Sequence, residues 1–198
     1  YTDQPNTSGT LNYSDEELEA FMTEAHAENI QISLHCVGDR ASDQFLRVIE
    51  KVIRKQPDKK LRHRIEHFSF GTADQIQRAN HLGVCVSAQP GFNYYWPHET
   101  YTELLGEERA HRVDPIASVI NGGVPVALGS DCTVTPCDPL LAIHAAVNHS
   151  LEQERISADN ALYAHTCGGA YLARNERTHG AIAAGYAADL AFLEADPA

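Results

Sequence analysis

Strand patterns and helix patterns alternate along most of this sequence. Short apolar or β-branched runs predict strands at residues 30–35, 61–68, 84–88 and 124–129. A segment with helical periodicity follows each of these runs. Because each helix returns the chain to the same end of the sheet, four such units in succession predict an α/β fold with a parallel sheet.

The number of these units favours half of a (β/α)8 TIM barrel. An intact barrel typically needs ~250 residues, whereas this sequence has 198 residues and about four units. An open doubly wound sheet has units of similar length, but the glycine-rich motifs G-x-G-x-x-G and G-x-x-x-x-G-K-[ST] are absent, which removes its usual nucleotide-binding forms. The sequence opens on Tyr1 without an initiating Met, and we expect a portion of a longer protein.

Capping residues set the expected helix boundaries. Ser14 with Glu17 and Thr72 with Gln75 form capping boxes, which predict that helices begin at the following residues. Aspartates are predicted to cap three further helices, at Asp39, Asp114 and Asp138. Residues 89–112 lack regular periodicity and predict a long loop with short helical pieces, and DLAFLE at 189–194 predicts a last strand.

Composition limits the partners and the compartment. The formal net charge is −12, and no basic run exceeds Lys59-Lys60, so nucleic acid and anionic membrane surfaces are not expected partners. No apolar segment reaches the ~20 residues of a membrane span. The five cysteines, an odd number without a Cys-x-x-Cys motif, favour a reducing cytoplasm over a disulfide framework.

Three polar residues stand where predicted strands end. His35 ends the first strand, His67 ends the second, and Asp131 follows the fourth. In parallel α/β proteins these carboxyl ends meet at the edge where ligands bind. Histidines on adjacent strands ~4.8 Å apart can reach one zinc ion, whereas His63 and His67, four residues apart on one strand, are separated by about 13 Å and cannot. Glu66 is expected to face the helix layer, with Arg64 as its partner.

The other histidines lie on predicted helices or loops, where solvated or packed side chains are the ordinary outcome. They are His26, His81, His98, His111, His144, His149, His165 and His179. The aromatic run at 92–96, which includes Trp96, fits either a substrate wall or core beneath a loop.

The sequence resembles the second half of the amidohydrolase superfamily, in its amidohydrolase-3 branch of metal-dependent hydrolases similar to N-substituted formamide deformylase. The resemblance rests on LHCVGDRA, RHRIEHF, VSAQP, LGSDCTVTPCDPL and GAIAAGYAADLAFLEADP, in this order. It implies barrel strands 5 to 8 over residues 1–178, and over 179–198 the start of a small β-domain.

The resemblance also implies roles for individual residues. His35 and His67 match the histidine metal ligands of strands 5 and 6, and Asp131 matches the strand-8 aspartate that ligates metal and carries a proton. One or two divalent ions, usually zinc, would activate water for hydrolysis of amide-type C–N bonds in a small-molecule substrate. Contacts to the ligands or to the substrate are expected from five further residues, Asp39, Arg40, Glu66, Gln89 and Trp96.

The sequence departs from this family in its missing half. No His-x-His pair is present, and each Lys, at 51, 55, 59 and 60, is predicted on a helix or loop, so no carboxylated lysine at a strand end is expected. A non-catalytic half-barrel fragment or interaction protein therefore remains an alternative. Its open strand edges would favour a homo-oligomer or pairing with the missing half. A lactonase or phosphoesterase on the same barrel is a further alternative, because metal-activated water does not choose its electrophile.

Overall fold

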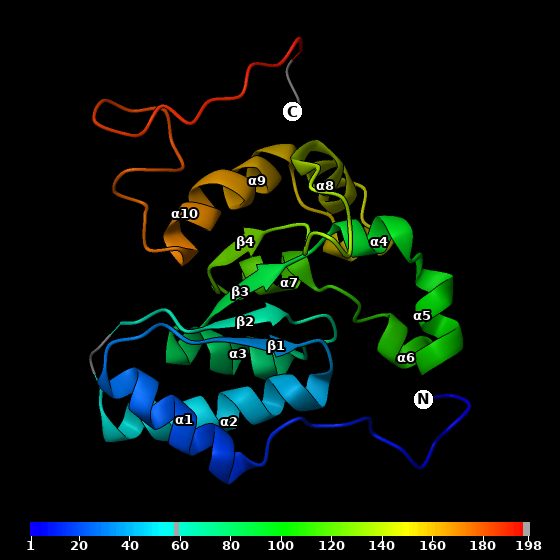
Figure 1. The fold of residues 1–198 in the computed structure, drawn as a ribbon. Helices are drawn as coiled ribbons and strands as arrows, with labels where there is room; N and C mark the ends of the chain where they lie inside the picture. The colour runs from blue at the N-terminus through cyan, green and yellow to red at the C-terminus, as the bar shows by residue number, and fades with distance from the viewer. Residues whose placement is uncertain (58–59, 196–198) are drawn as a thin grey trace.

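The computed structural model describes residues 1–57 and 60–195, and its centre is a parallel sheet. The four strands lie in chain order, β1 (Ser33–Cys36), β2 (Arg64–His67), β3 (Cys85–Ala88) and β4 (Val126–Leu128). The predicted strands and their parallel arrangement are confirmed, with shorter bounds. All four carboxyl ends therefore meet at one edge (Figure 1).

Helices cover one face of the sheet and continue beyond its last strand (Figure 1). Those before β4 are α1 (Asp15–Ala27), α2 (Asp39–Lys55), α3 (Ala73–Leu82), α4 (Gly91–Tyr95), α5 (His98–Leu105), α6 (Glu107–Ala110) and α7 (Ile116–Asn121). Those after β4 are α8 (Pro139–Val147), a 3-10 helix (Glu152–Glu154), α9 (Ala158–Tyr163), a π-helix (Ala164–Gly168) and α10 (Gly169–Leu172). The irregular segment 89–112 thus contains three short helices, as expected.

The apolar stripe of α2 forms the centre of the core. Phe45, Val48, Ile49 and Val52 recur at helical spacing and pack against Ile65 of β2. All five side chains are at most 1% exposed. This packing fixes α2 under the first strands, so that the β1–α2 loop lies at the carboxyl edge of the sheet.

Three of the five predicted caps form as expected. The boxes at Ser14 and Thr72 are complete, and the Asp138 side chain accepts a hydrogen bond from Leu141 N at 3.0 Å. The predictions for Asp39 and Asp114 are wrong: Gly38 and Pro115 are the N-cap residues of α2 and α7, and neither helix has a side-chain cap. Each aspartate side chain is engaged in tertiary contacts instead.

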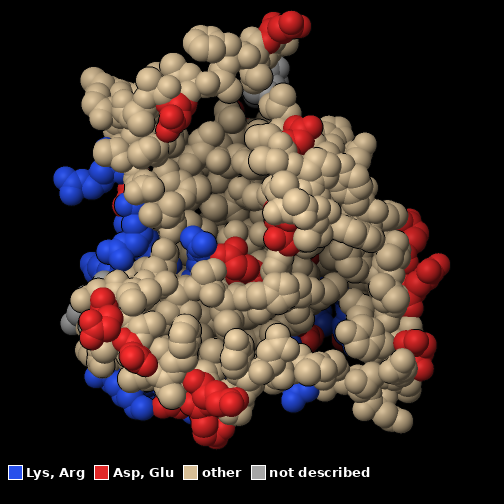
Figure 2. All heavy atoms as spheres, viewed as in Figure 1, with Lys and Arg blue, Asp and Glu red and all other residues tan. Residues whose placement is uncertain are grey.

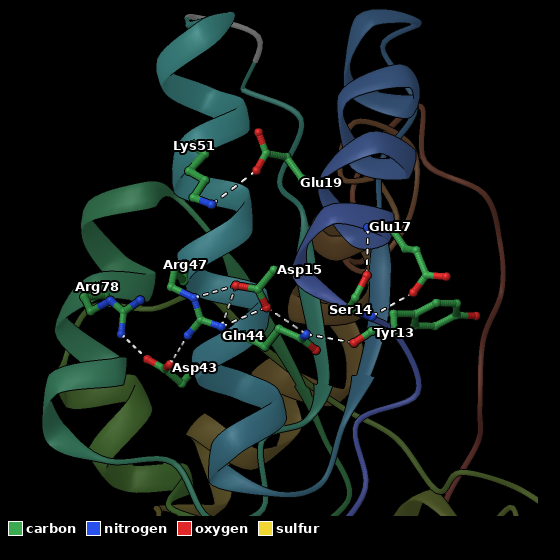
Figure 3. A network of polar contacts seen from close by, with 10 residues as sticks. All are labelled: Tyr13, Ser14, Asp15, Glu17, Glu19, Asp43, Gln44, Arg47, Lys51 and Arg78. Atoms are coloured by element: carbon green, nitrogen blue, oxygen red, sulfur yellow. Dashed lines mark hydrogen bonds and ion pairs between the residues drawn. The ribbon is translucent and has the colours of Figure 1, made fainter.

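A polar network joins α1, α2 and α3 (Figure 3). Arg47 donates hydrogen bonds to Asp15 at 2.9 and 3.0 Å and pairs with Asp43 at 2.5 Å, while Arg78 reaches Asp43 at 2.7 Å. Hydrogen bonds from Gln44 and Arg47 lower the pKa of Asp15. Because these groups are partly solvated, the network orients the helices more than it stabilises them.

The predicted last strand over residues 189–194 is wrong. Residues 181–195 project from the body of the molecule, and among the described residues no strand pairs with them (Figure 1). Phe192 is 92% exposed and Ile182 is 91% exposed. A strand needs a neighbour to bond its backbone, and the described chain supplies none here. Residues 196–198 of the expected β-domain segment, like Lys59, lie outside the described residues.

The charged side chains do not form a continuous basic surface on the face drawn in Figure 2. Lys and Arg gather along the left and lower edges of this view, whereas Asp and Glu are spread over it. None of the helices in the described residues combines the length and the apolar character that crossing a membrane requires.

A pair of buried histidines links α1 to the start of β2. His26 Nδ1 lies 2.9 Å from His63 Nε2, His26 Nε2 lies 2.8 Å from Gln56 O, and His63 Nδ1 accepts from Ile32 N at 3.0 Å. Because His63 Nδ1 accepts from Ile32 N, the His63 proton lies on Nε2 and is donated to His26. Burial, assisted by the nearby His26, lowers the pKa of His63 to about 4.

This pair predicts a loss of stability in mild acid. The unfolded chain binds a proton at His63 near pH 6.5, and the folded chain binds it only near pH 4, so the unfolded state holds more protons between these values. His63 should therefore lower the free energy of unfolding by about 3 kcal/mol as the pH drops from 6.5 to 4, and the buried His149, whose pKa burial also lowers to about 4, should add a similar loss. Urea titrations at several pH values measure it. H63A should remove the His63 part of this dependence and leave the His149 part, whereas H81A, at an exposed position, should leave the whole dependence intact.

Candidate metal centre

Two imidazole rings meet at the carboxyl edge of β1 and β2. His35 Nδ1 lies 2.9 Å from His67 Nε2, and the ring centroids are 4.5 Å apart at an interplanar angle of 76°. The backbone makes this contact possible, because His67 and Phe68 have positive φ angles of 77° and 59°. The strand's alternation of side chains ends there, and the His67 ring comes to lie against His35.

Asp131 completes this group from the far side of the sheet. It follows β4 in the sequence GSD, and its Oδ2 lies 4.0 Å from His67 Nε2. The Asp131 side chain is 40% exposed, whereas that of His67 is 6% exposed. The structure thus places His67 between the other two side chains that the sequence analysis singled out, in contact with His35 and 4.0 Å from Asp131. We call His35, His67 and Asp131 the rim cluster.

The surroundings of His67 lower the pKa of its ring, which favours the neutral imidazole. Burial lowers the pKa of His67, and the neighbouring His35 lowers it further, against the opposing effect of Asp131. A neutral imidazole has a lone pair on one ring nitrogen, and that lone pair is what a metal ion binds. Two nitrogens bound to one tetrahedral zinc ion at ~2.1 Å lie about 3.4 Å apart, which is close to the observed 2.9 Å.

Gln89 lies behind the His67 ring. It is 5% exposed, and its Nε2 donates to Ser87 O at 3.1 Å. Gln89 Oε1 and His67 Nδ1 are both buried without a hydrogen-bond partner, although Gln89 is near enough to raise the pKa of His67. A hydrogen bond from Nδ1–H to Oε1 would satisfy both atoms and leave the Nε2 lone pair facing the rim cluster.

Aromatic rings of α4 cover the other side of His67. Phe92 stacks on the His67 ring at a centroid distance of 5.8 Å and an angle of 17°, and Trp96 meets Phe92 edge-on at 5.4 Å. Trp96 is therefore one ring removed from the rim cluster, and the contact is made by Phe92. The sequence predicted a role for the aromatic run 92–96 and for Trp96, but not for Phe92, because only the fold shows which ring reaches the end of the strand.

Glu66 faces the open side of the sheet, so its expected position against the helices is wrong. It accepts hydrogen bonds from Ser33 and from Arg64, while its neighbour Ile65 is the buried residue that packs on α2. Burial raises the pKa of Glu66, but hydrogen bonds from Ser33, Ser87 and Arg64 outweigh it, so the pKa lies below its usual value. The expected pairing with Arg64 is confirmed.

Asp39 and Arg40 lie at the start of α2, on the wall of a cavity of about 450 Å³. Asp39 accepts from Arg40 N at 2.8 Å and pairs with Arg112 at 3.6 Å, and Arg40 donates to Ser8 at 2.8 Å. Residues 7–11 and part of α5 also line this cavity. These two residues therefore line an opening beside the β1–α2 loop and have no contact with the rim cluster among their hydrogen bonds and ion pairs.

Histidines and an aspartate at the carboxyl ends of parallel strands are typical of α/β proteins that bind a metal ion. The profile described as "Amidohydrolase family" matches residues 1–198. The chain belongs to the amidohydrolase family.

Individual relatives agree with this assignment. YtcJ of Bacillus subtilis, which is named as an amidohydrolase, is 31% identical over 100% of this chain and 38% of its own length. N-substituted formamide deformylase of Arthrobacter pascens is 31% identical over 93% of this chain and 35% of its own. An uncharacterized metal-dependent hydrolase from Pyrococcus furiosus superposes with a TM-score of 0.86 at 30% identity, over 100% of this chain and 40% of that one. The chain thus spans about two fifths of the length of these proteins.

Proposed function

We propose that this chain forms strands 5 to 8 of a (β/α)8 barrel in a zinc-dependent hydrolase of amide-type C–N bonds. The observation that carries the proposal is the position of His67 Nε2, 2.9 Å from His35 Nδ1 and 4.0 Å from Asp131 Oδ2. The name of the Arthrobacter relative, a deformylase of N-substituted formamides, supports the choice of the C–N bond. All five cysteines are free thiols, which supports a reducing cytoplasm as its compartment.

The residues of the rim cluster have separate roles in this reaction. His35 and His67 would hold the ion, through Nδ1 and Nε2, and their donor types suit zinc. A bound zinc ion would polarise a carbonyl and lower the pKa of its water to about 7. The Asp131 carboxylate accepts the proton of the attacking water and then donates it to the leaving nitrogen. Its partial exposure suits a group that must reach both the water and the substrate.

The remaining parts of the site would come from a complementary half-barrel. Within the described residues the sheet ends at β1 and β4, and the outer edges of these strands are unpaired. Unpaired edges favour association with further strands, which would close the barrel and add ligands to the two histidines and the aspartate. We assign residues 1–178 to this partial barrel and 179–198 to the start of a β-domain, and we propose a small molecule as the substrate.

Zinc binding by the purified chain tests the rim cluster directly. After treatment with a chelator, the chain should take up zinc in equilibrium dialysis, and the H35A/D131N variant should lack one of the bound ions. H144A removes an exposed histidine of α8 and should bind as much zinc as the wild type. Equal zinc uptake by wild type and H35A/D131N would contradict the hydrolase proposal and would favour a non-catalytic half-barrel.

Gln89 should contribute to zinc affinity without touching the ion. Q89L removes the amide that orients His67, and we expect zinc affinity at the rim cluster to fall about 10- to 100-fold. Competition with a chromophoric chelator measures this change. Q89E, which keeps an acceptor oxygen at the same position, should restore most of the affinity, whereas equal affinity for Q89L and wild type would remove this role from Gln89.

A further inference from the structure

A second group of potential metal ligands lies on the α5–α6 hairpin. His98 begins α5, Glu107 begins α6, and His111 follows the last residue of α6. Glu107 Oε1 lies 3.0 Å from His111 Nε2 and 3.6 Å from His98 Nε2, and the three ligand atoms lie within 4.8 Å of one another. We call these residues the hairpin cluster.

Local structure explains why the three side chains meet. Glu107 and His111 are four residues apart, so they project from the same side of one helical turn. Gly106 has a φ of 81°, a conformation that side chains rarely adopt, and this turn folds α6 back along α5. The two helices consequently lie side by side (Figure 1), and the His98 and His111 rings approach to a centroid distance of 5.2 Å.

The carboxylate of Glu107 in the hairpin cluster has no Lys or Arg partner among the described residues. In the described part of the chain, Glu107 forms ion pairs with the two histidines and none with Lys or Arg. Both imidazole Nε2 atoms and one carboxylate oxygen converge, which is a donor set that suits zinc and other late first-row divalent ions. His98 presents Nε2 to the cluster, while its Nδ1 is buried without a hydrogen-bond partner and can carry the ring's proton.

An ion at the hairpin cluster would hold part of a cavity wall in place. Tyr101, Leu104 and Leu105 of α5 and Arg109 of α6 line the cavity of about 450 Å³ that Asp39 and Arg40 also line. Leu104 O accepts from Thr2 N at 3.0 Å, so the same helix holds the start of the chain. An ion bound by both helices would cross-link them and hold one wall of this cavity in place.

We propose that His98, Glu107 and His111 bind a divalent transition-metal ion of the zinc class, separate from the rim cluster, and that this ion fixes the α5–α6 hairpin. Water would complete the coordination of the ion. The inference does not depend on the hydrolase proposal, because it rests on other residues and on binding alone.

Zinc titration of the full chain by calorimetry, together with dialysis and metal analysis, tests this site. In the H35A/D131N background, which removes the rim cluster, one zinc ion should still bind. Adding H98A/H111A removes two of the three ligands and should weaken that binding by more than the ~100-fold that loss of an outer-shell partner can cost. Glu108→Gln changes an exposed neighbour of Glu107 and should leave the affinity unchanged. Loss of all zinc binding in H35A/D131N, or unchanged binding in H98A/H111A, would overturn the proposal.

The effect on the hairpin needs its own measurement. Zinc should slow amide hydrogen exchange over residues 98–111 in wild type and in H35A/D131N, but not in H98A/H111A. Far-ultraviolet circular dichroism of the metal-free variants identifies any that fail to fold, and E107Q, which keeps the shape of the side chain, then serves as the replacement. Zinc-induced protection that persists in both H98A/H111A and E107Q would contradict the assignment of the ligands.

Discussion

Replacement of Asp131 by Asn should lower kcat for amide hydrolysis by about 10²- to 10⁴-fold, the usual contribution of a positioned acid–base group. Asn keeps the size of the side chain but cannot accept the proton of the attacking water. The measurement is the rate of amide hydrolysis by the assembled enzyme at saturating zinc, so that weaker zinc binding does not cause the loss.

Two comparisons make this experiment specific. Asp159→Asn changes an exposed aspartate of α9 by the same chemistry and should keep the wild-type rate. Zinc analysis of the D131N sample should show an occupied site, because the two histidines remain. A D131N enzyme with full activity and bound zinc would exclude Asp131 as the proton carrier.

Truncation of Phe45 should cause the largest loss of stability. Its ring is 0% exposed in the centre of the core, and Phe-to-Ala changes at such positions cost about 3–5 kcal/mol through lost burial and the remaining cavity. This is a large part of the ~5–15 kcal/mol that stabilises an ordinary domain. The midpoint of urea unfolding measures the change.

Phe21 of α1 provides the matched control, because it is the same residue type at 62% exposure. F21A should change the free energy of unfolding by no more than about 0.5 kcal/mol, as at other surface positions. Similar losses for F45A and F21A would mean that the apolar stripe of α2 does not form the core.

Local rules in the sequence account for most of the fold. The capping boxes at Ser14 and Thr72, the Asp138 cap and the alternation of strand and helix patterns depend on residues close together in the chain, and all are confirmed. The predicted strand over 189–194 is wrong because a strand depends on a distant partner. The Asp114 cap is wrong because its carboxyl is buried instead, where it accepts from Asn93 at 2.9 Å and where burial raises its pKa to about 7.

For the candidate metal centre, the sequence by itself determined which residue types stand at the ends of neighbouring parallel strands, and thus that His35, His67 and Asp131 share one edge. Only the tertiary structure decided how they face one another. The left-handed backbone at His67 and Phe68 turns the His67 ring against His35. Alternation counted back from His67 therefore misplaces Glu66, which alternates with the buried Ile65 and lies on the open face. Strand alternation is a local rule, whereas the backbone at a strand's end is set by packing from elements far away in the sequence.

The meeting of His98, Glu107 and His111 likewise required the folded hairpin, because contacts between two helices are absent from the periodicity of either one.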